Sequence, residues 1–360
     1  MPLDLTADVV TLTAALCDIE SVSRDESAVC DAIEEALKPL EHLRVTRIGN
    51  TVVARTELGH DERVVLAGHI DTVPLTDPPN LPTKQLPGGD GEGDVLWGRG
   101  TVDMKGGVAV QLRLAATVPE PSRDVTYVFY EGEEIESEFN GLLHIQEQRP
   151  DLIEDADFAV LLEPTGAIVE GGCKGTLRID LTTKGAAAHS ARPWNGHNAI
   201  HDAADILSRL TAYQPKTVMV DGLEYREALN AVNIRGGIAG NVIPDLCEVS
   251  VNYRYAPDTS EEQAVAHMHE VFDGLTFQVT DNAGGARPGL DLPAAKAFVE
   301  ALGVDVIAKQ GWTDVARFQA MGLPAVNFGP GDPNLAHHDE ERCPIDQLVS
   351  CEAAMLRWLA

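Results

Sequence analysis

The chain has no apolar run long enough to cross a bilayer, although 44% of its 360 residues are hydrophobic. Its first residues show no basic segment ahead of an apolar one, so we expect no secretory signal. The six cysteines are scattered and form no Cys-x-x-Cys pair, which favours reduced thiols over a disulfide framework. These absences predict a globular cytoplasmic protein without a membrane partner.

Basic residues are also scarce, because 27 Lys and Arg stand against 57 Asp and Glu and the net charge is −30. Nucleic-acid binding needs a basic surface, so this balance argues against a nucleic-acid partner. The simplest interpretation of the excess is a solvated acidic surface. If the substrate is itself an anion, local arginines must overcome an unfavourable overall field.

Three apolar runs predict buried strands, and each ends in side chains that can bind a metal. The runs are residues 64–67, 125–130 and 158–162. The side chains that follow them are His69 and Asp71, Glu133 and Glu134, and Glu163. Taken singly, a histidine at a strand end is more often a hydrogen-bonded loop residue, and an acidic stretch is more often a solvated loop. Ligands bind outside the carboxyl ends of strands in open α/β sheets, so three such ends favour one shared metal site.

A glycine-rich turn carries Asp103 and precedes a helix predicted over 108–116. Glycines allow close approach of backbone segments, and the turn lacks the spacing of a dinucleotide or P-loop fingerprint. Asp103 is therefore a candidate carboxylate that faces His69 and bridges two metal ions.

The length of the chain predicts two domains rather than one. From 175 to 184 the apolar residues alternate with polar ones, which is typical of a sheet with one wet face. Strands and helices then follow in the order of a ferredoxin-like unit, whose second helix opens with a capping box at Thr259 and Glu262. We predict a catalytic α/β domain (1–173 and 285–360) with a mixed central sheet flanked by helices, and an inserted α+β domain (174–284).

Five motifs in this order resemble the two-zinc aminoacylase and carboxypeptidase family. They are Gly68-His69-Ile70-Asp71, Gly98-Arg-Gly-Thr-Val-Asp103-Met-Lys-Gly106, Glu133-Glu134, Glu163-Pro164 and a late histidine. The resemblance covers nearly the whole chain and implies a hydrolase of linear amides with two divalent ions per subunit. Zinc is the expected metal, with cobalt or manganese as alternatives. A metal lowers the pKa of bound water to about 7, so amides can be hydrolysed at neutral pH.

The resemblance also implies roles for individual residues. The expected ligands are His69, Asp103 and Glu163 for one ion, and Asp103, Glu134 and the late histidine for the other. Asp71 would orient the first histidine, and Glu133 would be the general base. The late ligand is His337 or His338. We favour His337, which places Glu340 where the family has Asp or Asn.

The inserted domain supplies the other implied contacts. The segment around His189 matches the one whose histidine reaches the partner subunit's active site and stabilises the oxyanion, which implies a homodimer with a dimerisation and lid domain. Asn241, Arg254 and Arg317 are expected to bind substrate, and their motifs are similar to the desuccinylase branch of the family. That branch removes the succinyl group from N-succinyl-LL-2,6-diaminopimelate in lysine and diaminopimelate biosynthesis, by Glu-assisted attack of a metal-bridging water.

Other interpretations stay open at this point. The chain has Thr313-Asp-Val-Ala-Arg317-Phe where the desuccinylase motif has a Ser-Asp-Gly-Arg-Phe core. Acetylornithine deacetylase, or another N-acyl-amino-acid amidohydrolase or carboxypeptidase of the family, is therefore the alternative. From other classes, the sequence also allows a family member that serves only for binding, and a two-metal phosphoesterase. The intact Glu133 and the full ligand set argue against the binding protein.

Overall fold

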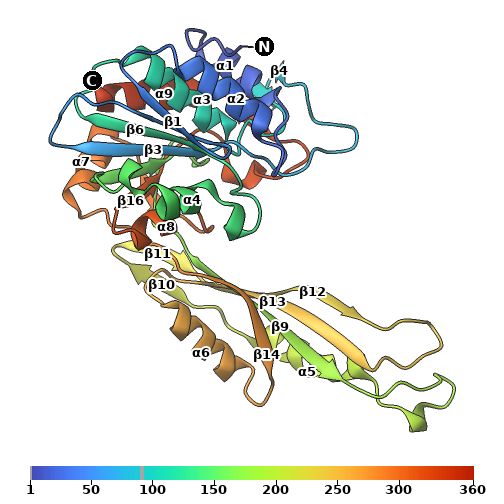
Figure 1. Cartoon of the computed structure of the whole chain (residues 1–360). Coiled ribbons are helices and arrows are strands. Elements are labelled where there is room, and N and C mark those ends of the chain that lie inside the picture. Colours follow the sequence, from blue (N-terminus) through green and yellow to red (C-terminus); the bar gives the residue numbers. More distant parts are fainter. Residues whose placement is uncertain (1, 90–92) are drawn as a thin grey trace. The chain divides into compact units, whose positions relative to one another are not determined.

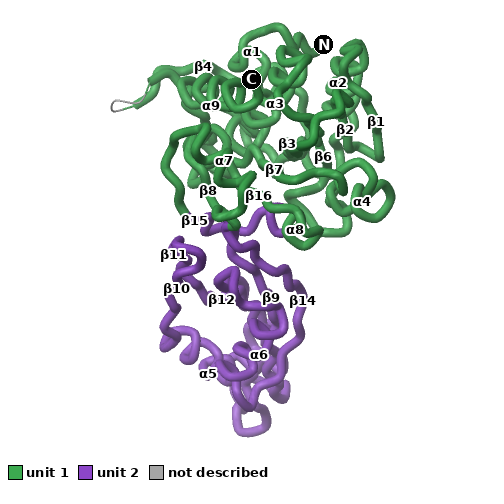
Figure 2. Tube along the Cα trace, turned by 90° about the vertical axis from the view of Figure 1, so that its left-hand side faces the viewer, with its two compact units in different colours: residues 1–171, 289–307, 317–360 green, residues 172–288, 308–316 purple. Residues whose placement is uncertain are grey.

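The computed structural model describes residues 2–89 and 93–360, which form two compact units (Figure 2). Unit 1 comprises residues 1–171, 289–307 and 317–360. Unit 2 comprises residues 172–288 and 308–316. Among the residues described, no helix is both long enough and apolar enough to cross a membrane.

The segment 308–316 belongs to unit 2, whereas the sequence placed it in the catalytic domain. Hydrogen bonds within unit 2 explain the difference. Trp312 Nε1 donates to the carbonyl oxygen of Gly284 (3.1 Å), and the N–H of Lys174 donates to the carbonyl oxygen of Gly311 (3.2 Å). These bonds join residues far apart in the chain, and hydrophobic patterning does not report such pairings.

Unit 1 is built on an eight-stranded mixed sheet, which confirms the predicted α/β class. In spatial order its strands are β1 (Arg44–Ile48), β2 (Thr51–Arg55), β6 (Asp124–Tyr130), β3 (Arg63–His69), β7 (Phe158–Leu161), β16 (Ala325–Asn327), β8 (Val169–Gly171) and β15 (Val306–Ala308). β6, β3, β7 and β16 run parallel to one another, whereas β1 pairs antiparallel to β2, β2 to β6 and β8 to β16. Every residue of β3, β6 and β7 is buried, as expected for parallel strands covered on both faces.

Helices cover the two faces of this sheet (Figure 1). Those of unit 1 include α1 (Val9–Cys17), α2 (Ser27–Leu37), α3 (Lys105–Thr117), α4 (Gly141–Gln148), α7 (Pro293–Leu302) and α9 (Ile345–Leu359). Residues of α1, α2, α3, α7 and α9 share one hydrophobic cluster with alternate strand residues such as Leu66 and Tyr127. The alternation follows from the two-residue period of a strand. α4 lies on the other side of the sheet (Figure 1).

A small sheet of three strands was not predicted. Its strands, in the order β17-β5-β4, are β4 (Lys84–Leu86), β5 (Val95–Trp97) and β17 (Arg342–Pro344). Runs of three residues are too short to show a period of two. β5 leads into the glycine-rich turn with Asp103, and β17 follows the loop with His337. Because β5 and β17 pair antiparallel, the sheet joins these two loops.

Unit 2 contains a four-stranded antiparallel sheet in the order β12-β13-β9-β14. A hairpin of β10 (Thr217–Val220) and β11 (Leu223–Arg226) forms a separate sheet. The remaining elements are β9 (Gly175–Lys184), α5 (Ala199–Ala212), β12 (Ala228–Gly236), β13 (Leu246–Tyr255), α6 (Glu261–Val271) and β14 (Phe277–Ala283). Their chain order is that of a ferredoxin-like unit. The predicted cap of α6 is wrong by one residue. Ser260 and Gln263 form the capping box, because each side chain bonds the other's backbone N–H.

Candidate metal centre

β3 delivers two side chains of the centre from the carboxyl edge of the central sheet. It is buried along its whole length and pairs in parallel with β6 and β7. Gly68 is closely packed, since a Cβ at this position would lie 3.0 Å from both Met104 Cε and Gln111 Oε1, and these side chains would have to shift to admit it. His69 and Asp71 follow at 1% and 0% exposure. Both side chains are thus held by a rigid strand end.

The imidazole of His69 is held from both sides. Its Nδ1 lies 3.1 Å from the carbonyl oxygen of Asp71 and 3.4 Å from Asp71 Oδ1, and its Nε2 lies 3.0 Å from Asp103 Oδ1. A proton on Nδ1 is donated to Asp71, which leaves Nε2 to bind a metal next to Asp103. The sequence predicted that these three residues would lie together, and the structure brings them together.

Asp71 also holds the turn that carries the paired glutamates. Its Oδ1 accepts the N–H of Glu133 (3.1 Å) and its Oδ2 accepts the N–H of Glu134 (3.2 Å). Its Oδ2 also accepts the hydroxyl of Ser23 (2.7 Å). Asp71 therefore links the strand with His69 to the turn after β6. Ser23 was missed by sequence reasoning, because it lies far from the other residues in the chain and no local pattern marks it.

His69, Asp103 and Glu134 form a group that could hold a metal ion, since each offers a ligand atom within 4.8 Å of the others. His337 lies against the same carboxylates. Its Nε2 lies 2.9 and 3.0 Å from the two oxygens of Glu134 and 3.3 Å from Asp103 Oδ2. Asp103 thus turns Oδ1 to one histidine and Oδ2 to the other. This placement suits a carboxylate that bridges two cations.

The histidines balance the charge of this cluster. Burial opposes ionisation of Asp103, but hydrogen bonds with His337 and His69 hold its pKa well below the usual range. Hydrogen bonds with Asp103 and Glu134 raise the pKa of His337 to about 10. Burial, together with the charge of Asp103, raises the pKa of Glu134. The protonated rings act as counter-charges, and a divalent ion must displace their protons when it binds.

Glu163 lies two residues after the end of β7 and is 5% exposed. Ala67 on β3 pairs with Leu161 on β7, so the register extended by two residues brings Glu163 level with His69 at the sheet edge. The three-residue group described above does not include it. Its role as a ligand stays a prediction.

The two late histidines differ in their surroundings. His337 has a φ of 63°, a left-handed conformation that is uncommon for a residue with a side chain, and it faces Glu134. The ring of His338 instead accepts the N–H of Glu340 through Nδ1 (3.1 Å). Glu340 Oε2 in turn accepts the indole N–H of Trp97 (3.3 Å). The contacts of His337 match the choice that the sequence favoured.

Sequence reasoning gave Glu341 no role, yet its side chain is fully buried. Its Oε1 accepts the N–H groups of Val102 (3.0 Å) and Asp103 (3.1 Å). In the family that the sequence resembles, the late histidine is followed by two variable residues, Asp or Asn, and then Glu. Glu341 occupies that last position when His337 is the ligand, and this was the one signal that could have found it.

The predicted substrate residues are spread over both units. In unit 1, Arg317 on α8 (Val315–Ala320) donates through Nη2 to Ser137 Oγ (2.8 Å). In unit 2, Arg254 on β13 donates through Nε to Asn252 Oδ1 (2.9 Å). The carbonyl oxygen of Asn241 accepts the N–H of Ser190 (3.0 Å), beside His189.

His189 itself is exposed in unit 2. Its Nδ1 accepts the N–H of Ala191 (3.1 Å), and it forms an isolated β-bridge with Val242. The hydrogen bond fixes the ring through one nitrogen. The other nitrogen, Nε2, is then the one suited to donate to a ligand.

Comparisons with known proteins are consistent with a metal centre at this place in the fold. The sequence pattern of Peptidase family M20/M25/M40 matches residues 65–360. A Mycobacterium tuberculosis protein named for the succinyl-diaminopimelate desuccinylase DapE is 52% identical, over 99% of this chain and 99% of its own length. The succinyl-diaminopimelate desuccinylase of Corynebacterium glutamicum is 45% identical, over 99% of this chain and 98% of its own length.

Solved structures show the same fold at low identity. A tripeptidase from Staphylococcus aureus is 23% identical with a TM-score of 0.78, over 100% of this chain and 98% of its own. A Bacillus subtilis protein described as a dinuclear metal-binding peptidase is 17% identical with a TM-score of 0.70, over 98% of this chain and 96% of its own.

Proposed function

The chain belongs to peptidase family M20/M25/M40, and from that membership we propose that it removes the succinyl group from N-succinyl-LL-2,6-diaminopimelate. As a member it is a metal-dependent amide hydrolase. The choice of substrate rests on sequence similarity to two proteins named for that activity. They are 52% and 45% identical to this chain, and each alignment covers 99% of it. The reaction serves lysine and diaminopimelate biosynthesis, which supports the proposed cytoplasmic location.

The proposed cofactor is a pair of divalent ions, and the side chains fit it. One ion is assigned to His69, Asp103 and Glu163, and the other to Asp103, Glu134 and His337. The support is Asp103, whose two oxygens face the two histidines. Nitrogen and oxygen donors without thiolate suit zinc, with cobalt or manganese as alternatives. When bound, such ions lower the pKa of water to about 7 and polarise the scissile carbonyl.

The adjacent residues Glu133 and Glu134 have different proposed roles. The side chain of Glu134 is turned to His337 and is 7% exposed, so it serves the metals. Glu133 is half-buried and is the proposed general base, which takes the proton of the attacking water and passes it to the leaving amine. Asp71 fixes the backbone of both, and its bond to His69 sets the tautomer of that ring.

The substrate's carboxylates are assigned to Arg254 and Arg317, and Asn241 is a further proposed contact of the substrate. Among the described residues Arg254 forms no ion pair within 4 Å and donates to Asn252, and burial and the charge of Arg178 lower its pKa. A half-buried guanidinium without an ion-pair partner suits a bidentate carboxylate. A contact of this kind with the acyl carboxylate would let the protein prefer a succinyl group over the acetyl group of acetylornithine.

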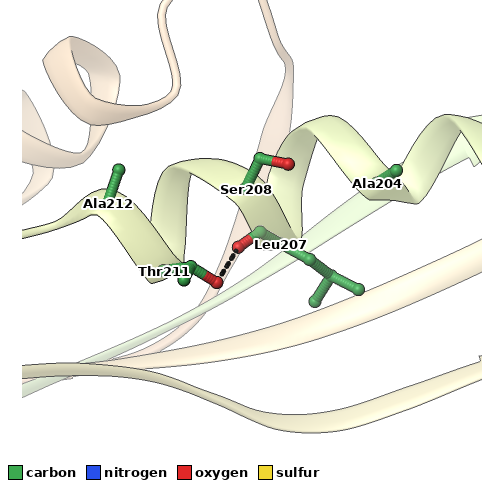
Figure 3. A pocket seen from close by; sticks show the side chains of 5 residues that line it. All are labelled: Ala204, Leu207, Ser208, Thr211 and Ala212. Carbon is green, nitrogen blue, oxygen red and sulfur yellow. Dashed lines mark hydrogen bonds between the residues drawn. The ribbon is translucent and has the colours of Figure 1, made fainter.

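The proposed homodimer is supported by the surface of unit 2. α5 has an open hollow of about 460 Å³ lined by small side chains and Leu207 (Figure 3). β12 is an edge strand of its sheet, and it exposes Val232 (58%) and Ile234 (48%). Edge strands with exposed apolar side chains pair readily with another chain, and a second copy gives a closed two-fold interface.

A hydrolysis panel tests the proposed activity. We expect N-succinyl-diaminopimelate to exceed N-acetylornithine in kcat/KM by about 10–100-fold, because a hydrogen bond to a charged group contributes ~1.5–3 kcal/mol. Phosphoesters should not be hydrolysed. Chelation should abolish turnover, and added divalent ions should restore it. A preference for N-acetylornithine would replace the desuccinylase with the alternative deacetylase.

The same panel on Arg317→Ala tests the acyl contact. The variant should raise KM for the succinylated substrate by about 10–100-fold and change the acetylated analogue little, since only the former has an acyl carboxylate. Equal losses on both substrates would assign Arg317 to the shared part of the substrate or to the bond with Ser137.

The adjacent histidines provide a matched pair of variants. His337→Ala should lose one of the two ions, because its Nε2 faces Glu134 and Asp103. His338→Ala should keep both, because that ring bonds only the backbone of its own loop among the described residues. Metal content per chain after dialysis, measured by atomic emission, separates them. Loss of an ion in His338→Ala but not in His337→Ala would reverse the assignment.

A further inference from the structure

Glu341 is a fully buried carboxylate next to the proposed metal centre, and both of its oxygens are engaged. Oε1 accepts the N–H groups of Val102 (3.0 Å) and Asp103 (3.1 Å). Oε2 accepts a hydrogen bond from Arg99 Nη1 (2.7 Å), and the side chain of Arg99 is only 4% exposed. One side chain therefore fixes the backbone on which the bridging carboxylate is mounted.

The backbone of the same residue ties the two ligand loops together. The carbonyl oxygen of Glu341 accepts the N–H of Gly98 (3.0 Å), and Arg99 Nη1 also lies 3.4 Å from the carbonyl oxygen of His338. Next to it, β17 pairs with β5 through Arg342 and Trp97. These bonds hold the loop with Asp103 and the loop with His337 together, although the two residues are 234 positions apart in the chain.

Burying the Arg99–Glu341 ion pair costs free energy. Burying an ion pair removes hydration from both partners, and a neutral side chain of the same shape could also accept the two backbone N–H groups. The ion pair between Arg99 and Glu341 offsets part of this cost, and the placement of Asp103 is what the pair secures. Arg99 is the counter-charge of this carboxylate, so Glu341 acts on the site chiefly by fixing the backbone of Val102 and Asp103.

We propose that Glu341 is a positioning residue that aims the Asp103 carboxylate between His69 and His337 and so sets the affinity for divalent ions. The inference rests on the proposed metal centre. Glu341 touches neither substrate nor metal. It acts through the Asp103 backbone, and Arg99 holds it in place from the other side.

Three variants separate shape, charge and general stability. Glu341→Gln keeps the shape and one acceptor oxygen but removes the charge, and Glu341→Asp keeps the charge but shortens the reach. The matched control is Glu352→Gln. It breaks the ion pair with Arg113, which has the same 2.7 Å distance and lies in the same unit.

The readout is Zn²⁺ binding to chelator-stripped protein by calorimetry, with the thermal midpoint of the stripped protein measured in parallel. Glu341→Gln and Glu341→Asp should bind Zn²⁺ about 10–100-fold more weakly, as is typical when a partner behind a ligand is removed. Glu352→Gln should bind as the wild type does. The cobalt-substituted Glu341 variants should also show an altered visible spectrum, which a loss of stability alone does not produce.

Two outcomes would contradict the proposal in different ways. If both Glu341 variants bind Zn²⁺ within about twofold of wild type while their stripped forms melt earlier, Glu341 is only a structural tie. If the wild type itself binds no divalent ion, the metal centre is wrong and the proposed function falls with it.

Discussion

Glu133→Gln is expected to keep both metal ions and to lower kcat by about 10²–10⁴-fold, the usual contribution of a general base. The amide has nearly the shape of the carboxylate but cannot accept a proton from water. The turn should survive the change, because Asp71 holds Glu133 and Glu134 through their backbone N–H groups. Metal content and single-turnover rates are the measurements that check this.

The neighbouring residue provides the control. Glu134→Gln removes a carboxylate that contacts His337 through both oxygens, so it should lose metal as well as activity. The two variants then differ in metal content although they differ by one position in the chain. Near-normal turnover by Glu133→Gln would mean that another group takes the proton. Loss of metal from Glu133→Gln would make that residue a ligand.

The sequence predicts best where local pattern decides the structure. Gly49-Asn50 between two short runs predicts a hairpin with a two-residue turn, and β1 and β2 form it, with Gly49 at the φ of +58° that such a turn requires. Apolar spacing predicts helices over 293–302 and 345–359, and α7 and α9 have these bounds. A proline at the start of α7 and a glycine after its end mark its limits.

The same distinction applies to the candidate site: residues marked by a local pattern could be predicted, and residues joined by long-range contacts could not. His69, Asp103 and Glu134 could be named because each follows a strand or a glycine-rich turn, and the structure groups them. Ser23 and Glu341 could not, because their bonds to Asp71 and Asp103 span 48 and 238 residues. Pairings of that range depend on tertiary packing, which a periodic pattern does not contain.

The other large effect concerns His189, which lies in unit 2 whereas the metal cluster lies in unit 1. His189→Ala should lower kcat by about 10²–10³-fold with its metals intact, because an oxyanion donor typically contributes that much. Its ring bonds the backbone of Ala191 through Nδ1, so the proposed donor is Nε2. His189→Gln retains a donor amide and should recover part of the loss.

Mixing two inactive variants tests whether this histidine acts across the dimer. In a two-fold dimer of Glu133→Gln with His189→Ala, one site has an intact Glu133 and the partner's intact histidine, and the other site has neither. With equal amounts and full exchange, half of the dimers are mixed and half of their sites are sound. Activity should therefore return to roughly a quarter of wild type. If His189 serves its own subunit, every site in the mixture lacks one group, and exchange shown by differently tagged subunits would bring no recovery.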